Sequence, residues 1–87
     1  MYYLKWNESN ITGLSSRQNC KILYTEVDQS GHVLREVGID TNGQVVHRAN
    51  TRGLFDNQII DQKSLRNDIT EQEFTKAWEK GNDEKTQ

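Results

Sequence analysis

The stretch from Lys21 to Ala49 constrains the fold more than any other part of the chain. It reads KILYTEVDQSGHVLREVGIDTNGQVVHRA and holds three strand-like segments separated by two turn sequences. Residues 29–31 (QSG) and 41–43 (TNG) each fit a three-residue hairpin loop that closes with a glycine in the left-handed conformation. The stretch therefore predicts an antiparallel meander of three strands.

The two loops also set a strand register, because register follows from turn type and from keeping apolar residues opposite each other. The predicted cross-strand pairs are Leu23 with Val37, Thr25 with Arg35, Val27 with Val33, and Ile39 with Val45. One face of the sheet, the predicted core, then carries Leu23, Val27, Val33, Val37, Ile39, Val45 and Ala49. The other face mixes apolar and charged residues and carries Ile22, Tyr24, Glu26, Leu34, Glu36, Val46 and Arg48.

Both ends of the chain add one element to this meander. Residues 1–6 (MYYLKW) alternate with a period of two and predict a fourth strand. Residues 70–80 predict a helix that starts at a capping box of Thr70 and Glu73 and stops at Gly81. Ile69 and Phe74 have the spacing of a hydrophobic staple around that start. The fold class is α+β, with the helix packed on one face of a sheet of about four strands.

The predicted domain spans residues 1–81, and residues 82–87 are expected to form a disordered tail. Residues 50–68 have no clean period, so their path is not predicted, although Ile59-Ile60 could form a short extra strand. A single helix covers only one face of such a sheet. The mixed face is therefore expected to be half-solvated or to be an interface.

Composition excludes several partner classes. The chain has 87 residues, a hydrophobic fraction of 32% and a net charge of −2, which indicate one domain with a thin core and no basic face for nucleic acid. Its single cysteine, Cys20, cannot form an internal disulfide. No secretory leader or membrane-spanning run is visible, so we expect a cytoplasmic protein that does not contact a membrane.

The residues that carry chemistry in other proteins form no recognisable constellation here. His32, His47 and Cys20 lack the spacing of a metal site, and none of the glycines opens a phosphate-binding loop. The two histidines could cleave RNA as an acid–base pair, but a turn histidine and a sheet histidine explain them more simply. Cys20 has no local base to activate it. We therefore expect no catalytic residue, no cofactor and no metal.

The carboxylates are of more interest as a group. They are either an ordinary solvated surface or an acidic patch that docks a basic partner, with Tyr24 or Trp6 as an aromatic anchor. Arg35 on the predicted core face is an anomaly: either it pairs with a carboxylate, or the face assignment is locally wrong. The predicted partner-binding residues are Tyr24, Glu26, Asp28, Glu36, Arg48, Asp56 and Asp61.

Four segments carry a family resemblance. They are residues 23–28 (LYTEVD), 33–39 (VLREVGI), 43–45 (GQV) and 69–78 (ITEQEFTKAW). With them the chain resembles a family of small bacterial domains typical of the immunity proteins of polymorphic-toxin and contact-dependent growth inhibition systems. The matching motifs are structural and carry over no functional residue. Residues 50–68 depart from the proline-containing loop of that family, because this chain has no proline.

The resemblance implies a protein that binds and blocks the toxic domain of a matching effector, often a nuclease, by occlusion. The partner would then be a protein, and the chain itself a monomer or a homodimer. The alternative is a non-catalytic interaction or regulatory module that acts as a homodimer through the mixed face or an edge strand. A small hydrolase that uses His32 and His47 ranks third.

Overall fold

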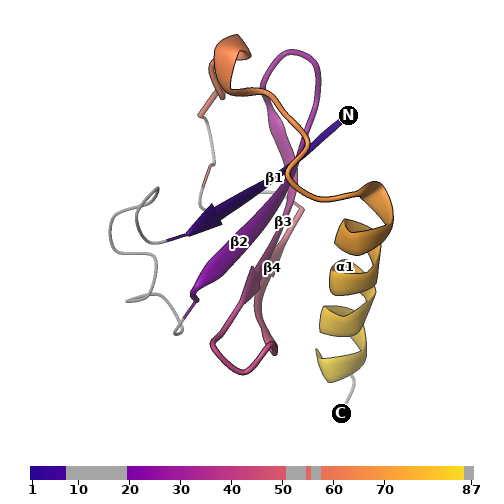
Figure 1. Cartoon of the computed structure of the whole chain (residues 1–87). Helices are drawn as coiled ribbons and strands as arrows, with labels where there is room; N and C mark the ends of the chain where they lie inside the picture. The colour runs from indigo at the N-terminus through magenta and orange to yellow at the C-terminus, as the bar shows by residue number, and fades with distance from the viewer. Residues whose placement is uncertain (8–19, 51–54, 56–57, 86–87) are drawn as a thin grey trace.

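The computed structural model describes residues 1–7, 20–50, 55 and 58–85, the last four as backbone alone. Strands β1 (Tyr2–Asn7), β2 (Ile22–Val27), β3 (Val33–Ile39) and β4 (Val45–Ala49) form one antiparallel sheet in the order β1-β2-β3-β4 (Figure 1). A short 3₁₀ helix, η2 (Gln62–Ser64), precedes helix α1 (Glu71–Lys85), which packs on one face of the sheet. The predicted α+β fold class is confirmed.

Both hairpin loops have the predicted form. Gly31 and Gly43 have φ angles of 92° and 81°, which an L side chain rarely adopts. The predicted pairs of Val27 with Val33 and of Ile39 with Val45 are also confirmed. In each loop the preceding aspartate accepts two backbone N–H groups through Oδ1, Asp28 from Ser30 and His32, and Asp40 from Asn42 and Gln44.

The rest of the predicted register is wrong, because the sheet contains two irregularities. The register shifts between Glu26 and Val27, so that Leu23 lies opposite Gly38 and Thr25 opposite Glu36. A second shift lies between Gly38 and Ile39. A bulge inserts one unpaired residue and so reverses which face the following side chains point to.

The two predicted faces are therefore mixed in the structure. On the α1 side, Val37, Tyr24, Ile39 and Val45 pack with Tyr3 of β1 around Ile69, Phe74, Ala77 and Trp78. On the opposite side, Leu4, Leu23, Val27 and Val33 form two further clusters with Phe55, Ile60 and Leu65. The second face is thus a core of its own, and the expectation that it would be half-solvated or an interface is wrong.

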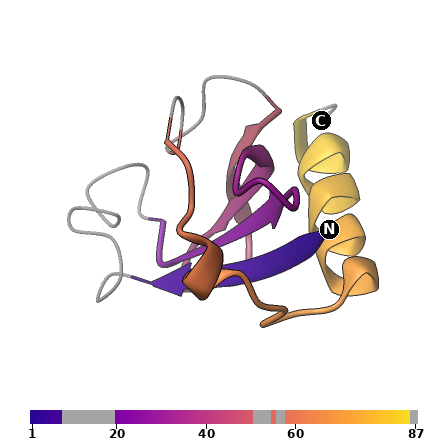
Figure 2. The same ribbon diagram turned by 90° about the horizontal axis from the view of Figure 1, so that it is seen from above.

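The segment between β4 and α1 explains how one helix and one loop cover both faces. Ile60 packs on the face opposite α1, and the chain then passes along the outer edge of β1 (Figure 2). There Asp68 donates its N–H to the carbonyl of Tyr3 at 2.8 Å, and its Oδ2 accepts the N–H of Lys5 at 2.9 Å. Ile59 forms a single bridge with His32 and not an extra strand.

Helix α1 begins as predicted but ends later. Thr70 Oγ1 accepts the N–H of Glu73 at 3.0 Å, and Glu73 Oε1 accepts that of Thr70 at 3.2 Å, which confirms the capping box. The helix continues through Gly81 to Lys85. A Cβ at Gly81 would clash with the Arg48 side chain and lie 2.8 Å from Val45, so this glycine allows close packing on β4 and does not end the helix. Among the described helices, none has the length and apolar composition needed to cross a bilayer.

The two loop glycines allow a matched test. Gly43→Ala is expected to cost about 1 kcal/mol of stability, because only the positive φ is penalised and nothing lies near a new Cβ. Gly31→Ala is expected to cost about 3 kcal/mol or more, because the Cβ would also clash with the Ile60 carbonyl oxygen. Equal losses in urea denaturation would contradict the tight contact between the first hairpin and residues 59–60.

Candidate interaction surfaces

Glu26 is at the centre of an ionic network under α1 and does not lie on an open face. Its carboxylate accepts two hydrogen bonds from Arg35, Nε at 2.7 Å and Nη2 at 2.8 Å, and one from the Tyr3 hydroxyl at 3.0 Å. These bonds pair the anomalous Arg35 with a carboxylate, as its position suggested. The Arg35 guanidinium holds the pKa of Glu26 below its usual value. Burial, with the Glu26 hydrogen bond, raises the pKa of Tyr3 to about 12.

Glu36 lies on the opposite face and is only 2% exposed. Its Oε1 lies 2.9 Å from His47 Nε2, and its Oε2 accepts the Phe55 N–H at 2.8 Å. A carboxylate this deeply buried and hydrogen-bonded secures the covering segment on the sheet. Its predicted role in partner binding therefore has no surface to act through.

Cys20 lies near this pair but has the properties of a structural residue. A Cβ at Gly38 would lie 2.7 Å from Cys20 Sγ and 2.9 Å from His47 Cβ, so the missing side chain of Gly38 leaves space for both. Burial raises the pKa of the Cys20 thiol, which works against formation of a nucleophilic thiolate. Within the described residues no three His, Cys, Asp or Glu side chains form a group that could hold a metal ion.

Tyr24 and Arg48 lie on the α1 side of the sheet. Tyr24 is half-buried, and burial followed by the charge of Glu73 raises the pKa of its hydroxyl. The guanidinium of Arg48 stacks on the Trp78 ring at 3.9 Å from its centroid. Both are more covered than predicted, because α1 spans the face that carries them.

The segments that carry Asp28 and Asp61 meet at the end of the first hairpin. His32 bridges to Ile59, the Asp28 carboxylate lies 3.7 Å from His32 Nδ1, and Gln62 donates to the carbonyl of Gln29. Ile59 is 64% exposed in the middle of these polar groups. We call this set the hairpin-end surface, defined by Asp28, His32, Ile59 and Asp61.

The two carboxylates of the hairpin-end surface are fixed by their own backbones. Backbone hydrogen bonds, first that from His32, lower the pKa of Asp28, and Asp61 caps η2 by accepting the Lys63 N–H at 3.0 Å. Each therefore presents a positioned negative charge beside an exposed apolar side chain. An apolar centre with a polar rim is the usual anatomy of a protein-binding surface. Asp56, the remaining predicted residue, lies outside the described residues.

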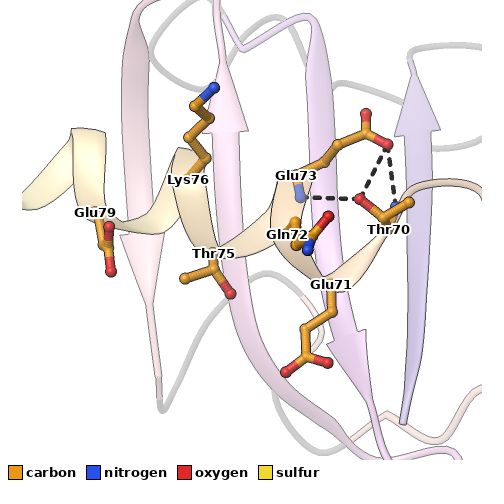
Figure 3. A pocket seen from close by; sticks show the side chains of 7 residues that line it. All are labelled: Thr70, Glu71, Gln72, Glu73, Thr75, Lys76 and Glu79. Atoms are coloured by element: carbon orange, nitrogen blue, oxygen red, sulfur yellow. Dashed lines mark hydrogen bonds between the residues drawn. The ribbon is translucent and has the colours of Figure 1, made fainter.

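A second acidic surface lies on the outer side of α1. Figure 3 shows an open depression whose lining has three carboxylates and one ammonium group, from Thr70, Glu71, Gln72, Glu73, Thr75, Lys76 and Glu79. The dashed bonds between Thr70 and Glu73 show that part of this lining is the capping box. The charge of this surface favours a cationic partner group, but its polar residues include no exposed apolar centre.

Sequence reasoning did not single out Ile59 as a binding residue or Trp78 as a partner of two arginines. Arg35 lies 4.9 Å and Arg48 3.9 Å from the Trp78 ring centroid, and the two arginines come from different strands. Ile59 lies in a segment without a period, so no pattern predicted which of the two adjacent isoleucines is buried. A charged residue such as Arg48 within a strand was the one signal in the sequence, and we interpreted it as part of the mixed, half-solvated face.

The fold and these surfaces define a small α+β protein with two covered sheet faces and an acidic, apolar-centred end. The chain matches no protein-family model, no curated protein and no solved structure.

Proposed function

We propose that this protein is an immunity protein that binds a cognate bacterial toxin domain, such as a nuclease, and neutralises it by stoichiometric occlusion in the cytoplasm. The observation that carries the proposal is the hairpin-end surface, where a 64% exposed isoleucine is flanked by two fixed carboxylates. An exposed apolar side chain between charged groups has the arrangement of a protein interface, a hydrophobic centre with a polar rim.

The proposed mechanism follows from charge. A nuclease binds phosphates through a basic groove, and the carboxylates of Asp28 and Asp61 would occupy such a groove in place of phosphates. Because the pKa of Asp28 is lowered, this carboxylate stays negative at any pH at which a cell works. Ile59 would supply the desolvated contact that slows dissociation.

The test is co-expression and co-purification with the product of the neighbouring upstream gene. We expect the wild-type chain to rescue growth and to form a one-to-one complex. Ile59→Arg is expected to weaken that complex at least tenfold, because it removes the apolar centre and places a cation opposite a basic partner. Asp61→Asn, which keeps an oxygen to cap η2, is expected to slow association, most strongly at low salt.

Gln72→Arg is the matched control, because it adds the same charge at an exposed position on α1. Its binding should remain near wild type. Absence of growth rescue, or equal loss of binding in Gln72→Arg and Ile59→Arg, would contradict the proposal. A wild-type homodimer that Ile59→Arg dissociates would instead support the alternative of a self-associating regulatory module.

A further inference from the structure

Arg48 is held rigidly between β4 and α1. Its stem passes directly over Gly81, where any side chain would clash with Cδ and lie 3.0 Å from Cγ. Its guanidinium then stacks on Trp78 at 3.9 Å. An arginine fixed in this way loses little further conformational freedom when it binds a ligand.

The charge of Arg48 is nevertheless unmatched. Of the three arginines in the described part of the chain, Arg35 pairs with Glu26 and Arg66 with Asp68. Among the described residues, the Arg48 side chain contacts Trp78 and Gly81 and has no hydrogen bond or ion pair. Its Nε is buried without an acceptor, while the residue as a whole is only partly buried.

We propose that Arg48 is an anchor for a carboxylate of a partner protein, bound end-on by its two terminal nitrogens. A guanidinium and a carboxylate match in shape and form two parallel hydrogen bonds. Arginine and tryptophan are also the residues that dominate binding energy in protein interfaces. The stacked pair of Arg48 and Trp78 is therefore a binding site distinct from the hairpin-end surface.

A carboxylate fits this position better than a phosphate. The neighbouring Arg35 is already neutralised by Glu26, and the Lys80 ammonium donates to the Gly43 carbonyl at 2.9 Å. Among the described cations at this position, Arg48 is therefore the one whose side chain has neither an anionic nor a carbonyl partner. The adjacent part of α1 is its carboxy-terminal half, where the helix dipole is negative and disfavours a second negative charge.

The experiment is a titration of the wild-type protein, labelled with nitrogen-15 at arginine, with a short end-blocked glutamate peptide at constant ionic strength. We expect the Arg48 Nε–H signal and the Trp78 indole signal to shift together and to saturate. The Arg66 Nε–H signal is the internal control, because that exposed arginine already has a carboxylate partner. A glutamine peptide of equal length should leave all these signals unchanged.

Inorganic phosphate provides the second arm of the titration. Tighter binding of phosphate than of the glutamate peptide at Arg48 would overturn the carboxylate assignment. An Arg48 signal that moves no more than that of Arg66 with either anion would overturn the site itself. Neither the toxin nor Ile59 enters this experiment, so its outcome and that of the proposed function are independent.

Discussion

Replacing Glu26 with alanine is expected to lower the free energy of unfolding by about 3 kcal/mol, because it leaves a cation without its partner under α1. The Glu26 side chain is 10% exposed and that of Arg35 29%, so solvent compensates for the loss only in part. Tyr3 also loses its hydrogen-bond acceptor. Arg35 would keep its contacts with the rings of Phe74 and Trp78.

Urea denaturation of the single and double variants tests this expectation. Glu26→Ala combined with Arg35→Met removes both charges, keeps an apolar stem against the rings, and should recover a large part of the loss. Gln29→Ala on the exposed first turn is the control and should be close to neutral. A loss below about 1 kcal/mol for Glu26→Ala would mean that the network contributes no more than a surface ion pair.

The same network should affect how the free energy of unfolding falls with decreasing pH. The Arg35 hydrogen bonds lower the folded-state pKa of Glu26 below the ordinary 4.5. Its contribution is therefore complete above pH 4.5 and is lost as the pH falls through the folded-state pKa. In Glu26→Ala the loss of stability on acidification should be shallower, while the part due to Asp28 persists because the pKa of that carboxyl is lowered independently.

Local signals predicted the turns and the helix start because their determinants lie within a few residues of each other. Gly31 and Gly43 adopt the left-handed conformation that their three-residue loops require. The capping box consists of hydrogen bonds between Thr70 and Glu73, which are three positions apart. The predicted end of α1 was wrong because it depends on a contact between residues far apart in the sequence. The role of Gly81 depends on its contact with Arg48, which lies more than thirty positions earlier in the sequence.

Face assignment failed at the bulges, which leave no mark in an alternating pattern. A single shift at Glu26 and Val27 moved Leu23 and Val27 to the face opposite Val37. The burial of two carboxylates was missed because of the same error in the register. A carboxylate is buried only when it has a partner, and the strand register decides which partner it meets. Because the predicted register did not bring Arg35 to Glu26 or His47 to Glu36, both carboxylates were predicted to lie on the surface.

The segment that covers the second face could not be derived from periodicity either. Phe55, Ile60 and Leu65 anchor it with irregular spacing, and its hydrogen bonds go to β1 and to the first hairpin. Of the predicted binding residues, Asp28 and Asp61 lie on segments that meet at the first hairpin, while Tyr24, Glu26 and Arg48 share the α1 side and Glu36 lies opposite. The charge of the chain therefore did not predict where these residues lie on the fold.

Phe74→Ala is expected to cost about 3–5 kcal/mol, the range for truncating a fully buried aromatic side chain. Phe74 is completely buried and contacts Tyr3 at 5.4 Å and Trp78 at 6.4 Å between ring centroids. It is also the α1 half of the staple with Ile69, so its loss weakens both the helix start and the docking of α1. A chain of 87 residues has a total stability of about 4–13 kcal/mol, so this one substitution removes a large share.

Thermal and urea unfolding of Phe74→Ala, Phe74→Leu and Gln72→Ala measure the effect. Gln72 is exposed on the same helix, and its replacement should leave stability unchanged. Phe74→Leu keeps most of the buried volume and should fall between the two. If Phe74→Ala lost no more than about 1 kcal/mol, α1 would contribute little to the fold. In that case Arg48 and Trp78 could not be held together as the carboxylate anchor requires, because Trp78 is positioned by the same helix.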